Sequence, residues 1–388
     1  MRHLLIIIIF FSENIFLAAQ EPIISVSFLL NEIEQNNTGL SAIRHQLEAE
    51  KVENKTGIYL NNPEVEVHYL WGNGSGNRTD YSISQQFDFP TAYHHKRKVS
   101  SAKNAQVDLK YQLARKEVLL QANRVCIELI SMNVLNEERT KRVMHAEEVA
   151  EAYRKKFDKG DANILDYNKS KLTLLNARRE LETGIAERDL LIAELTRLNG
   201  GIPVLFKNKT YPEVLLATDF EAWYRETKGK NLDLMYWERE VSLGKQQEKL
   251  VRSMNMPKFS AGYMKEELGG ITFGISIPLW ENKNTVKQIQ MQTRATHEMR
   301  EDEELKFYNK QKSGFQKAKT LLHIMEEFKK ELSLADNSDL LKKALEAGEI
   351  SLIDYLLELS IYYEAIDNLI ETEKNYQLTV AELQEWDI

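Results

Sequence analysis

KGDANILDY occupies residues 159–167, and AGEISLIDY occupies residues 347–355. Both stretches contain a Gly, an acidic residue, two aliphatic residues and an Asp-Tyr pair in the same order. Their glycines, Gly160 and Gly348, lie 188 positions apart, and the same offset holds from Pro90 to Leu195. A duplication of this length predicts a chain of two similar halves that bury their surfaces together.

Each half contains two stretches in which apolar and polar residues alternate. Alternation with a period of two predicts β-strands with one buried face. A proline precedes the first strand of each half and another follows the second, where a missing N–H breaks no ladder. One β-hairpin is therefore expected in each half. The expected strands span residues 64–69, 81–89, 259–263 and 271–277, and the prolines are Pro63, Pro90, Pro257 and Pro278.

The rest of each half is rich in helix formers and poor in Pro and Gly, which favours long helices. Two arms of about 93–95 Å are expected over residues 97–158 and 285–347, each ending at the repeated glycine as a helix does at its C-cap. Returning helices and the segments before the strands would together cover each arm. The returning helices are expected over 163–198 and 351–386, and the segments before the strands over 28–59 and 231–254.

The first 20 residues, MRHLLIIIIFFSENIFLAAQ, have the pattern of a secretory signal peptide. Arg2 precedes an apolar run over residues 4–11, and small residues follow it. A membrane anchor is the competing interpretation, but the run is too short to span about 30 Å of hydrocarbon as a helix. We therefore expect an exported protein that crosses a membrane, if at all, with strands.

The composition argues against several other classes of protein. Acids and bases are interleaved along the chain, with a formal net charge of -8, so there is no basic face for nucleic acid. Cys126 is the only cysteine, which excludes an intrachain disulfide and is expected to be a buried apolar residue. His94 and His95 are the only local His pair, and no catalytic or phosphate-binding motif is present. We expect no enzyme, no metal site and no cofactor.

Four strands leave two open edges and an apolar face, which an exported monomer should not expose. Membrane barrels need at least about eight strands, so two chains would supply eight and three would supply twelve. Aromatic residues cluster near the strand ends, as interfacial girdles require, although a sheet packed on helices uses aromatics as well. They are Tyr69, Trp71, Tyr81, Phe89, Tyr93, Tyr263 and Trp280.

The order of these features resembles the TolC-type outer-membrane efflux channel family over about residues 25–385. It consists of a helix, the NNPEV strand, the FDFP strand, a long arm and the KGDANILDY return, repeated as MPKF, ISIP and AGEISLIDY. The resemblance implies a mainly α fold of duplicated helical hairpins. These would form a coiled-coil-like α-barrel, with four β-strands per chain contributing to a trimeric, twelve-stranded outer-membrane β-barrel.

The resemblance also implies a function and a place in the cell. Members are passive homotrimeric exit ducts in the outer membrane of Gram-negative bacteria, with a long periplasmic extension. They open on docking with a periplasmic adaptor, or membrane fusion protein, and an inner-membrane pump, here expected to be of the resistance-nodulation-division type. The short chain favours export of small molecules or metal ions. An exported coiled-coil adaptor or scaffold without a channel is the alternative.

The expected domain organisation follows the repeat. A signal peptide over residues 1–20 precedes an N-terminal helix (21–62), a first β-hairpin (63–90) and a first helical hairpin (91–198) with its tip near 160. A connector and opening helix (199–254), a second β-hairpin (255–278) and a second helical hairpin (279–388) with its tip near 348 complete the chain.

In the family, the Asp six residues after the tip glycine faces the tunnel, which places Asp166 and Asp354 at the periplasmic aperture. Six carboxylates in a trimer would attract cations and repel one another. An Asp that caps the returning helix is the competing interpretation. Where better-known members have an Arg and a Tyr that hold the first Asp, this chain has Ile350 and Leu345. Lysines near the tips are the remaining candidate partners, namely Lys155, Lys156, Lys159, Lys342 and Lys343.

The hairpin tips are also where the family docks its adaptor. Small residues there would permit close approach of adaptor helices, and turn formation alone is the plainer role. The candidate contact residues are Gly160, Asp161, Ala162, Gly348, Glu349 and Ser351.

Overall fold

A computed structural model describes residues 25–72, 76–335 and 337–385, so the expected signal peptide lies outside the described residues. Each half consists of opening helices, a β-hairpin, a long arm and a returning helix. The first half comprises α1 (Val26–Asn36), α2 (Thr38–Glu53), β1 (Glu64–Leu70), β2 (Arg78–Phe87), α3 (Pro90–Lys159) and α4 (Ile164–Leu198). The second comprises α5 (Phe220–Thr227), the 3-10 turn η1 (Lys228–Lys230), α6 (Leu232–Met254), β3 (Lys258–Lys265), β4 (Gly269–Ser276), α7 (Thr285–Ala335), α8 (Ser338–Ala347) and α9 (Leu352–Leu383).

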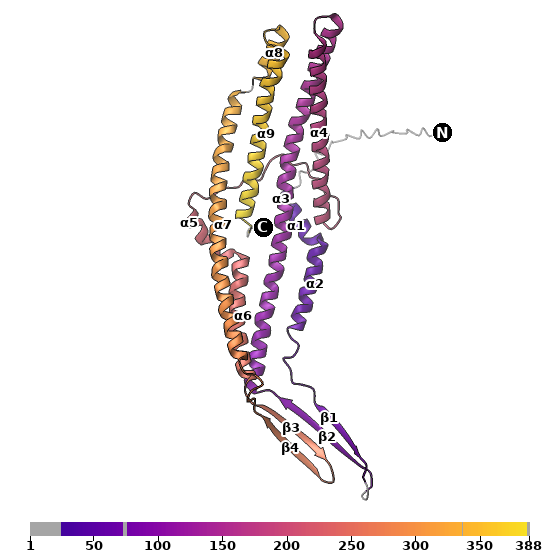
Figure 1. The fold of residues 1–388 in the computed structure, drawn as a ribbon, viewed down its shortest axis with the longest axis vertical. Helices are drawn as coiled ribbons and strands as arrows, with labels where there is room; N and C mark the ends of the chain where they lie inside the picture. The colour runs from indigo at the N-terminus through magenta and orange to yellow at the C-terminus, as the bar shows by residue number, and fades with distance from the viewer. Residues whose placement is uncertain (1–24, 73–75, 336, 386–388) are drawn as a thin grey trace, which may run out of the picture.

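The molecule is an elongated body of helices with the sheet at one end and both hairpin tips at the other (Figure 1). The central helix α3 contacts α2, α4, α6 and α9. Asn37, which caps α2, donates a hydrogen bond to the carbonyl oxygen of Leu198 in α4 at 2.8 Å, so these two helices meet end to end along α3. Lys116 of α3 lies 2.7 Å from Asp233 at the start of α6 and 3.6 Å from Glu385 just beyond α9. The same junction therefore exists in both halves.

The four strands form one antiparallel sheet in the order β1-β2-β3-β4. Val65 pairs with Ile83, Ile83 with Tyr263, and Tyr263 with Ile271, so apolar residues of all four strands share one face. The neighbouring positions, such as Thr272, carry mainly polar or small side chains on the other face. This alternation was predicted from the sequence. The pairing of β2 with β3, which joins the two hairpins, comes from the structure.

The long arms differ from the sequence expectation at two places. The first begins at Pro90 rather than at residue 97, because proline is well accommodated in the first turn of a helix. The second was expected to be continuous, but α7 ends at Ala335 and α8 begins at Ser338. Asn337, Ser338 and Asp339 favour helix ends because their side chains compete for nearby backbone groups.

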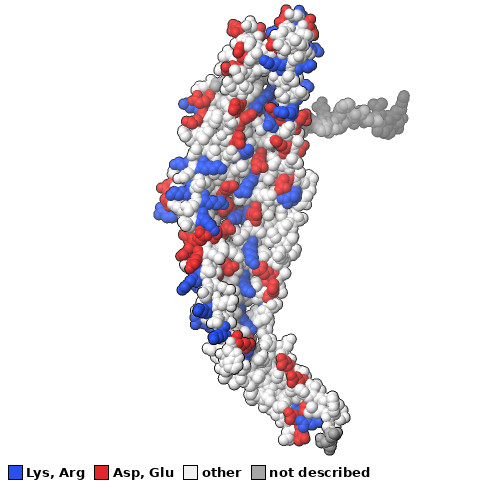
Figure 2. Space-filling view, in the orientation of Figure 1, with Lys and Arg blue, Asp and Glu red and all other residues white. Residues whose placement is uncertain are grey.

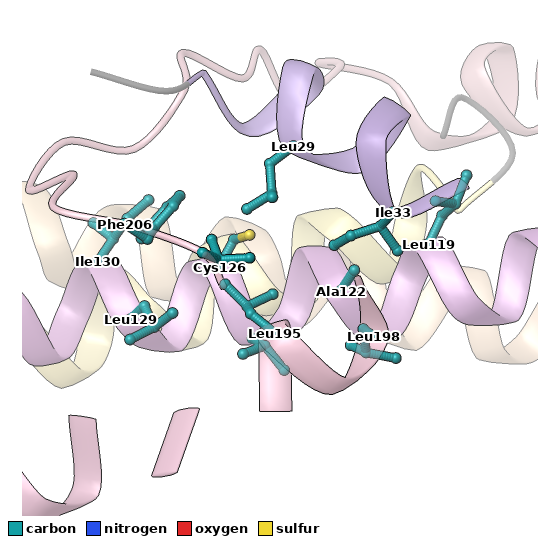
Figure 3. Close-up of a cluster of buried hydrophobic side chains, with 12 residues drawn as sticks. Leu29, Ile33, Leu119, Ala122, Cys126, Leu129, Ile130, Leu195, Leu198 and Phe206 are labelled. Atoms are coloured by element: carbon teal, nitrogen blue, oxygen red, sulfur yellow. The ribbon is translucent and has the colours of Figure 1, made fainter. Parts of the chain in front are cut away.

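A buried apolar cluster lies in the middle of the molecule, where α1, α3 and α4 meet Val204 and Phe206 of the connector after α4 (Figure 3). Cys126 is fully buried in this cluster, as expected, and burial raises the pKa of its thiol to about 12. A second cluster, around Phe315 and Val380, joins α7 and α9 to the later part of the connector. Among the described helices, α3 contains one stretch long and apolar enough to span a membrane, but half of that stretch is buried, as in the core helix of a bundle.

Candidate functional site

The two hairpin tips are built by the same turn. Gly160 and Gly348 adopt left-handed conformations with φ of 80° and 76°, which favour glycine. Each glycine and the residue after it donate backbone hydrogen bonds to the last turn of the preceding helix, at 2.9 and 2.8 Å in the first tip and 3.2 and 2.9 Å in the second. The repeated glycine is therefore a C-cap, as its sequence position predicted.

Both tip aspartates belong to the caps of the returning helices. The backbone N–H of Asp166 donates to the side chain of Asn163 at 2.9 Å, and the amide of Asn163 donates to the Asp166 carboxylate at 2.7 Å. Ser351 and Asp354 form a reciprocal capping box. The Ser351 hydroxyl, followed by its backbone N–H, lowers the pKa of Asp354. The Asp354 carboxylate thus has the helix-capping role that was the plainer interpretation, whereas the Asp166 carboxylate holds the side chain of the N-cap residue Asn163.

The tips pack against each other through apolar side chains. Leu345 and Tyr355 of the second hairpin are buried with Tyr153 of α3, and Ile350 packs against this tip cluster. Leu345 and Ile350 occupy the positions at which the resemblance implies polar partners for the first aspartate. An apolar contact between the hairpins therefore stands in place of that polar link. Ala162 packs against the same cluster from the first tip.

The tip lysines do not pair with Asp166 or Asp354 within the described part of the chain. Lys342 of α8 instead donates to Glu148 of α3 at 2.6 Å and so joins the two hairpins. This hydrogen bond raises the pKa of Lys342 and lowers that of Glu148. The lysines considered from the sequence were Lys155, Lys156, Lys159, Lys342 and Lys343.

Comparisons with known proteins identify the fold. Scans of protein-family models and of curated proteins found no match. The Campylobacter jejuni outer-membrane channel CmeC is similar with a TM-score of 0.76 and 12% identity, over 93% of this chain and 85% of that one. The Vibrio cholerae outer-membrane protein VceC has a TM-score of 0.77 and 12% identity, over 93% and 95% of the two chains. The open state of the Neisseria gonorrhoeae MtrE outer-membrane channel has a TM-score of 0.74 and 12% identity, over 93% and 88%.

This chain has the TolC-type channel fold. Its described part reproduces the duplicated hairpins and the four strands that the sequence predicted for that fold. At 12% identity these likenesses establish the architecture and leave the role of each residue to the geometry of this chain.

Within the TolC-type fold, a partly buried polar network that the sequence analysis missed joins the two hairpins of the chain. Arg142 of α3 donates to both oxygens of Asp367 in α9, at 2.9 and 2.6 Å. The Arg142 guanidinium also lies 4.6 Å from the ring centre of Tyr363, whose hydroxyl is 3.0 Å from His145 Nδ1. A groove of about 480 Å³ lies beside this network. The sequence did contain one signal for this contact. In the repeat alignment Asp367 corresponds to Arg179 of the first half, so the two halves carry opposite charges at this position.

The proposed girdle aromatics of the TolC-type fold lie toward the two ends of the sheet. Four of them, mostly exposed, are near the hairpin turns, and two are at the end that joins the helices. The first group is Tyr69, Trp71, Tyr81 and Tyr263, and the second is Phe89 and Trp280. Tyr69 and Trp71 contact each other with ring centres 6.1 Å apart, as do Phe89 and Phe259 at 6.2 Å.

The described residues contain no group of His, Cys, Asp and Glu side chains arranged to hold a metal ion. His94 and His95 meet edge to face with ring centres 5.4 Å apart. In this edge-to-face contact the two rings pack against each other, so their nitrogens do not point at a common ligand. The candidate site of this chain is therefore the paired tips and the network behind them.

Proposed function

We propose that this chain is the outer-membrane channel of a tripartite efflux pump. It would be a passive trimeric exit duct, opened by docking with a periplasmic adaptor and an inner-membrane transporter of the resistance-nodulation-division type, and would export small molecules or metal ions. The observation that carries the proposal is the sheet, which has one exposed apolar face and, within the described part of the chain, two edges that pair with no other strand. When copies join edge to edge in a bilayer, the edge strands form hydrogen bonds with neighbouring copies and the apolar face contacts lipid. Three copies supply twelve strands.

The shape of the chain supports the same function. α3 has 70 residues, which corresponds to a length of about 105 Å. With the sheet in the outer membrane of a Gram-negative bacterium, helices of this length would place the tips deep in the periplasm. Both tips lie at the end opposite the sheet (Figure 1), where adaptor hairpins would approach Gly160, Asp161, Gly348, Glu349 and Ser351.

The tip aspartates would act at the aperture of the duct. In a trimer, Asp166 and Asp354 would supply six carboxylates near the periplasmic mouth. The capping contacts lower the pKa of Asp354 and so favour its ionised form. Such a ring would attract cations and resist closure through mutual repulsion.

The first test is the mass of the mature protein extracted from outer membranes in detergent, measured by light scattering. We expect a trimer that conducts in planar bilayers. Asp166→Asn combined with Asp354→Asn should lower the preference of the current for cations, whereas Glu182→Gln combined with Glu371→Gln should not, because those exposed acids lie on the helix faces. A monomer that needs no detergent would contradict the channel and favour the coiled-coil scaffold.

A further inference from the structure

Basic side chains gather where the helices meet the sheet. Six of them lie within a few turns of the strand ends, on α3, α6, β3, the turn after β4 and the start of α7. We call this set the basic belt. It consists of Arg97, Lys98, Lys249, Lys258, Lys283 and Lys287. Figure 2 shows Lys and Arg side chains on the lower ends of the helices, directly above the sheet.

The belt charges are not neutralised within the described part of the chain. None of the six belt residues has an ion pair or a side-chain hydrogen bond there, whereas the neighbouring Lys96 pairs with Asp88 at 2.8 Å and Arg252 with Glu248 at 2.6 Å. Glu64, at the start of β1, and Glu281 are acids at this end of the sheet that lack such a partner among the described residues. The six unpaired bases outnumber these acids, so the belt carries a net positive charge in a chain whose formal net charge is -8.

Charges from different elements converge in the belt. Burial, together with nearby His94, Lys249 and Lys98, lowers the pKa of His95. Lys249 lies on α6 and Lys98 on α3, so the two helices direct positive charge to the same place. Arg97 and Lys98 are consecutive helical residues and therefore project about 100° apart. The two side chains therefore leave α3 in different directions.

The belt lies beside exposed apolar side chains. Leu279 and Trp280, in the turn that leads from β4 to α7, are 73% and 77% exposed, and Lys283 follows them. Lys98 is about 12 Å along α3 from Pro90, where the helix leaves the sheet. An aromatic side chain flanked by lysines is typical of a membrane–water interface, where the ring lies at the level of the headgroups.

The opposite end of the sheet has a different charge pattern. Arg78, near the first hairpin turn, lies 2.7 Å from Asp80 and 3.6 Å from both Glu266 and Glu267. Acids thus outnumber the bases at that end, where Lys265 is the other base. Lys265 is the single base without an ion pair among the described residues at that end, whereas six such bases lie at the helix end.

We propose that the basic belt binds the phosphate headgroups of anionic phospholipids in the periplasmic leaflet of the outer membrane, an inference that rests on the proposed channel function. That orientation places the belt at headgroup level and the apolar sheet face in the hydrocarbon. Lys and Arg side chains near an anionic lipid surface each strengthen binding, and their positive charge complements the lipid phosphate. The contact would fix the depth of the duct in the membrane.

The test measures lipid preference in the detergent-solubilised trimer. The protein is mixed with equal amounts of anionic phosphatidylglycerol and zwitterionic phosphatidylcholine, and bound lipids are counted by native mass spectrometry. We expect phosphatidylglycerol to predominate. The preference should fall when salt is raised from about 0.1 M to about 1 M, because the screening length decreases from about 10 Å to about 3 Å.

A charge-removing variant and a matched control locate the binding surface. Lys98→Gln combined with Lys249→Gln and Lys287→Gln should reduce the preference by up to about a hundred-fold, from about five-fold per basic residue. Lys317→Gln combined with Lys319→Gln and Lys343→Gln removes the same charge from exposed positions far from the sheet and should leave the preference unchanged. Equal losses in both variants would overturn the proposal.

Further outcomes separate the lipid proposal from its alternatives. Displacement of phosphatidylglycerol by inorganic phosphate at matched ionic strength would overturn it in favour of a free-anion site. A trimer that conducts in phosphatidylcholine bilayers but binds both lipids equally would overturn the belt and leave the channel intact. A monomer that needs no detergent and does not conduct would overturn both.

Discussion

Asp367 links the two hairpins, because both of its carboxylate oxygens accept hydrogen bonds from Arg142. The Arg142 side chain is only 9% exposed, whereas that of Asp367 is 43% exposed. Arg142 Nε is already buried without a hydrogen-bond partner. Loss of the carboxylate would therefore leave most of a buried positive charge uncompensated.

We expect Asp367→Asn to lower the free energy of unfolding by about 1.5–3 kcal/mol, the range for hydrogen bonds to charged groups. A fully buried pair would cost more, but water partly screens Asp367. Thermal unfolding of the purified protein measures the change. Glu371→Gln, at an exposed site one turn further along α9, is the control and should change stability by less than about 0.5 kcal/mol. Similar values for the two variants would show that the pair does not join the hairpins.

At the scale of elements, the crossing of α3 and α4 depends on Gly184. This glycine is buried in α4, and a Cβ atom there would overlap Asn136 Oδ1 and Arg139 Nη1 of α3. Both polar atoms of the Asn136 side chain are buried without a hydrogen-bond partner. The absence of a side chain at Gly184 thus permits close approach of the two helices. The polar atoms at this contact lack hydrogen-bond partners among the described residues.

Gly184→Ala should destabilise the protein by about 1–3 kcal/mol, because overpacking of a close contact forces side chains and backbone to shift. This effect opposes the gain of up to about 1 kcal/mol that alanine brings to a helix interior. Adding Asn136→Ala should restore much of the loss, since that side chain forms no hydrogen bond that would be broken. Chemical denaturation of the single and double variants tests the pair, and a single variant as stable as the parent would refute the close contact.

At the scale of the whole molecule, the two faces of the sheet decide which side meets lipid. Phe273 is 83% exposed on the apolar face in the middle of β4, and the adjacent Thr272 lies on the polar face. In a closed barrel the apolar face would contact hydrocarbon and the polar face would line the lumen. The two neighbouring positions therefore experience different solvents in the proposed assembly.

Phe273→Arg should cost about 2–4 kcal/mol per chain, the range for Arg at the bilayer midplane, and should deplete the assembled trimer in outer membranes. Thr272→Arg adds the same charge one residue away and should be tolerated in the lumen. Trimer abundance on semi-native gels measures both variants. Equal depletion, or depletion by Thr272→Arg alone, would contradict the assigned orientation.

The sequence by itself determined the features that depend on local or periodic signals. Gly160 and Gly348 were predictable as caps because few other residues adopt positive φ at low cost. The strands were predictable because alternation and flanking prolines are local patterns, and the repeat supplied each pattern twice. The break at Asn337 was missed, because short polar residues are tolerated inside many helices and only the balance of contacts decides whether the helix ends there.

Only the tertiary structure decided the contacts between segments far apart in the chain. Arg142 and Asp367 are 225 positions apart, and the basic belt combines residues of four elements. No periodicity in a sequence specifies which faces of two helices meet, since that depends on packing along their whole length. For the same reason, the sequence showed apolar residues at positions 345 and 350, but only the structure shows that Leu345 packs against Tyr153 of the other hairpin.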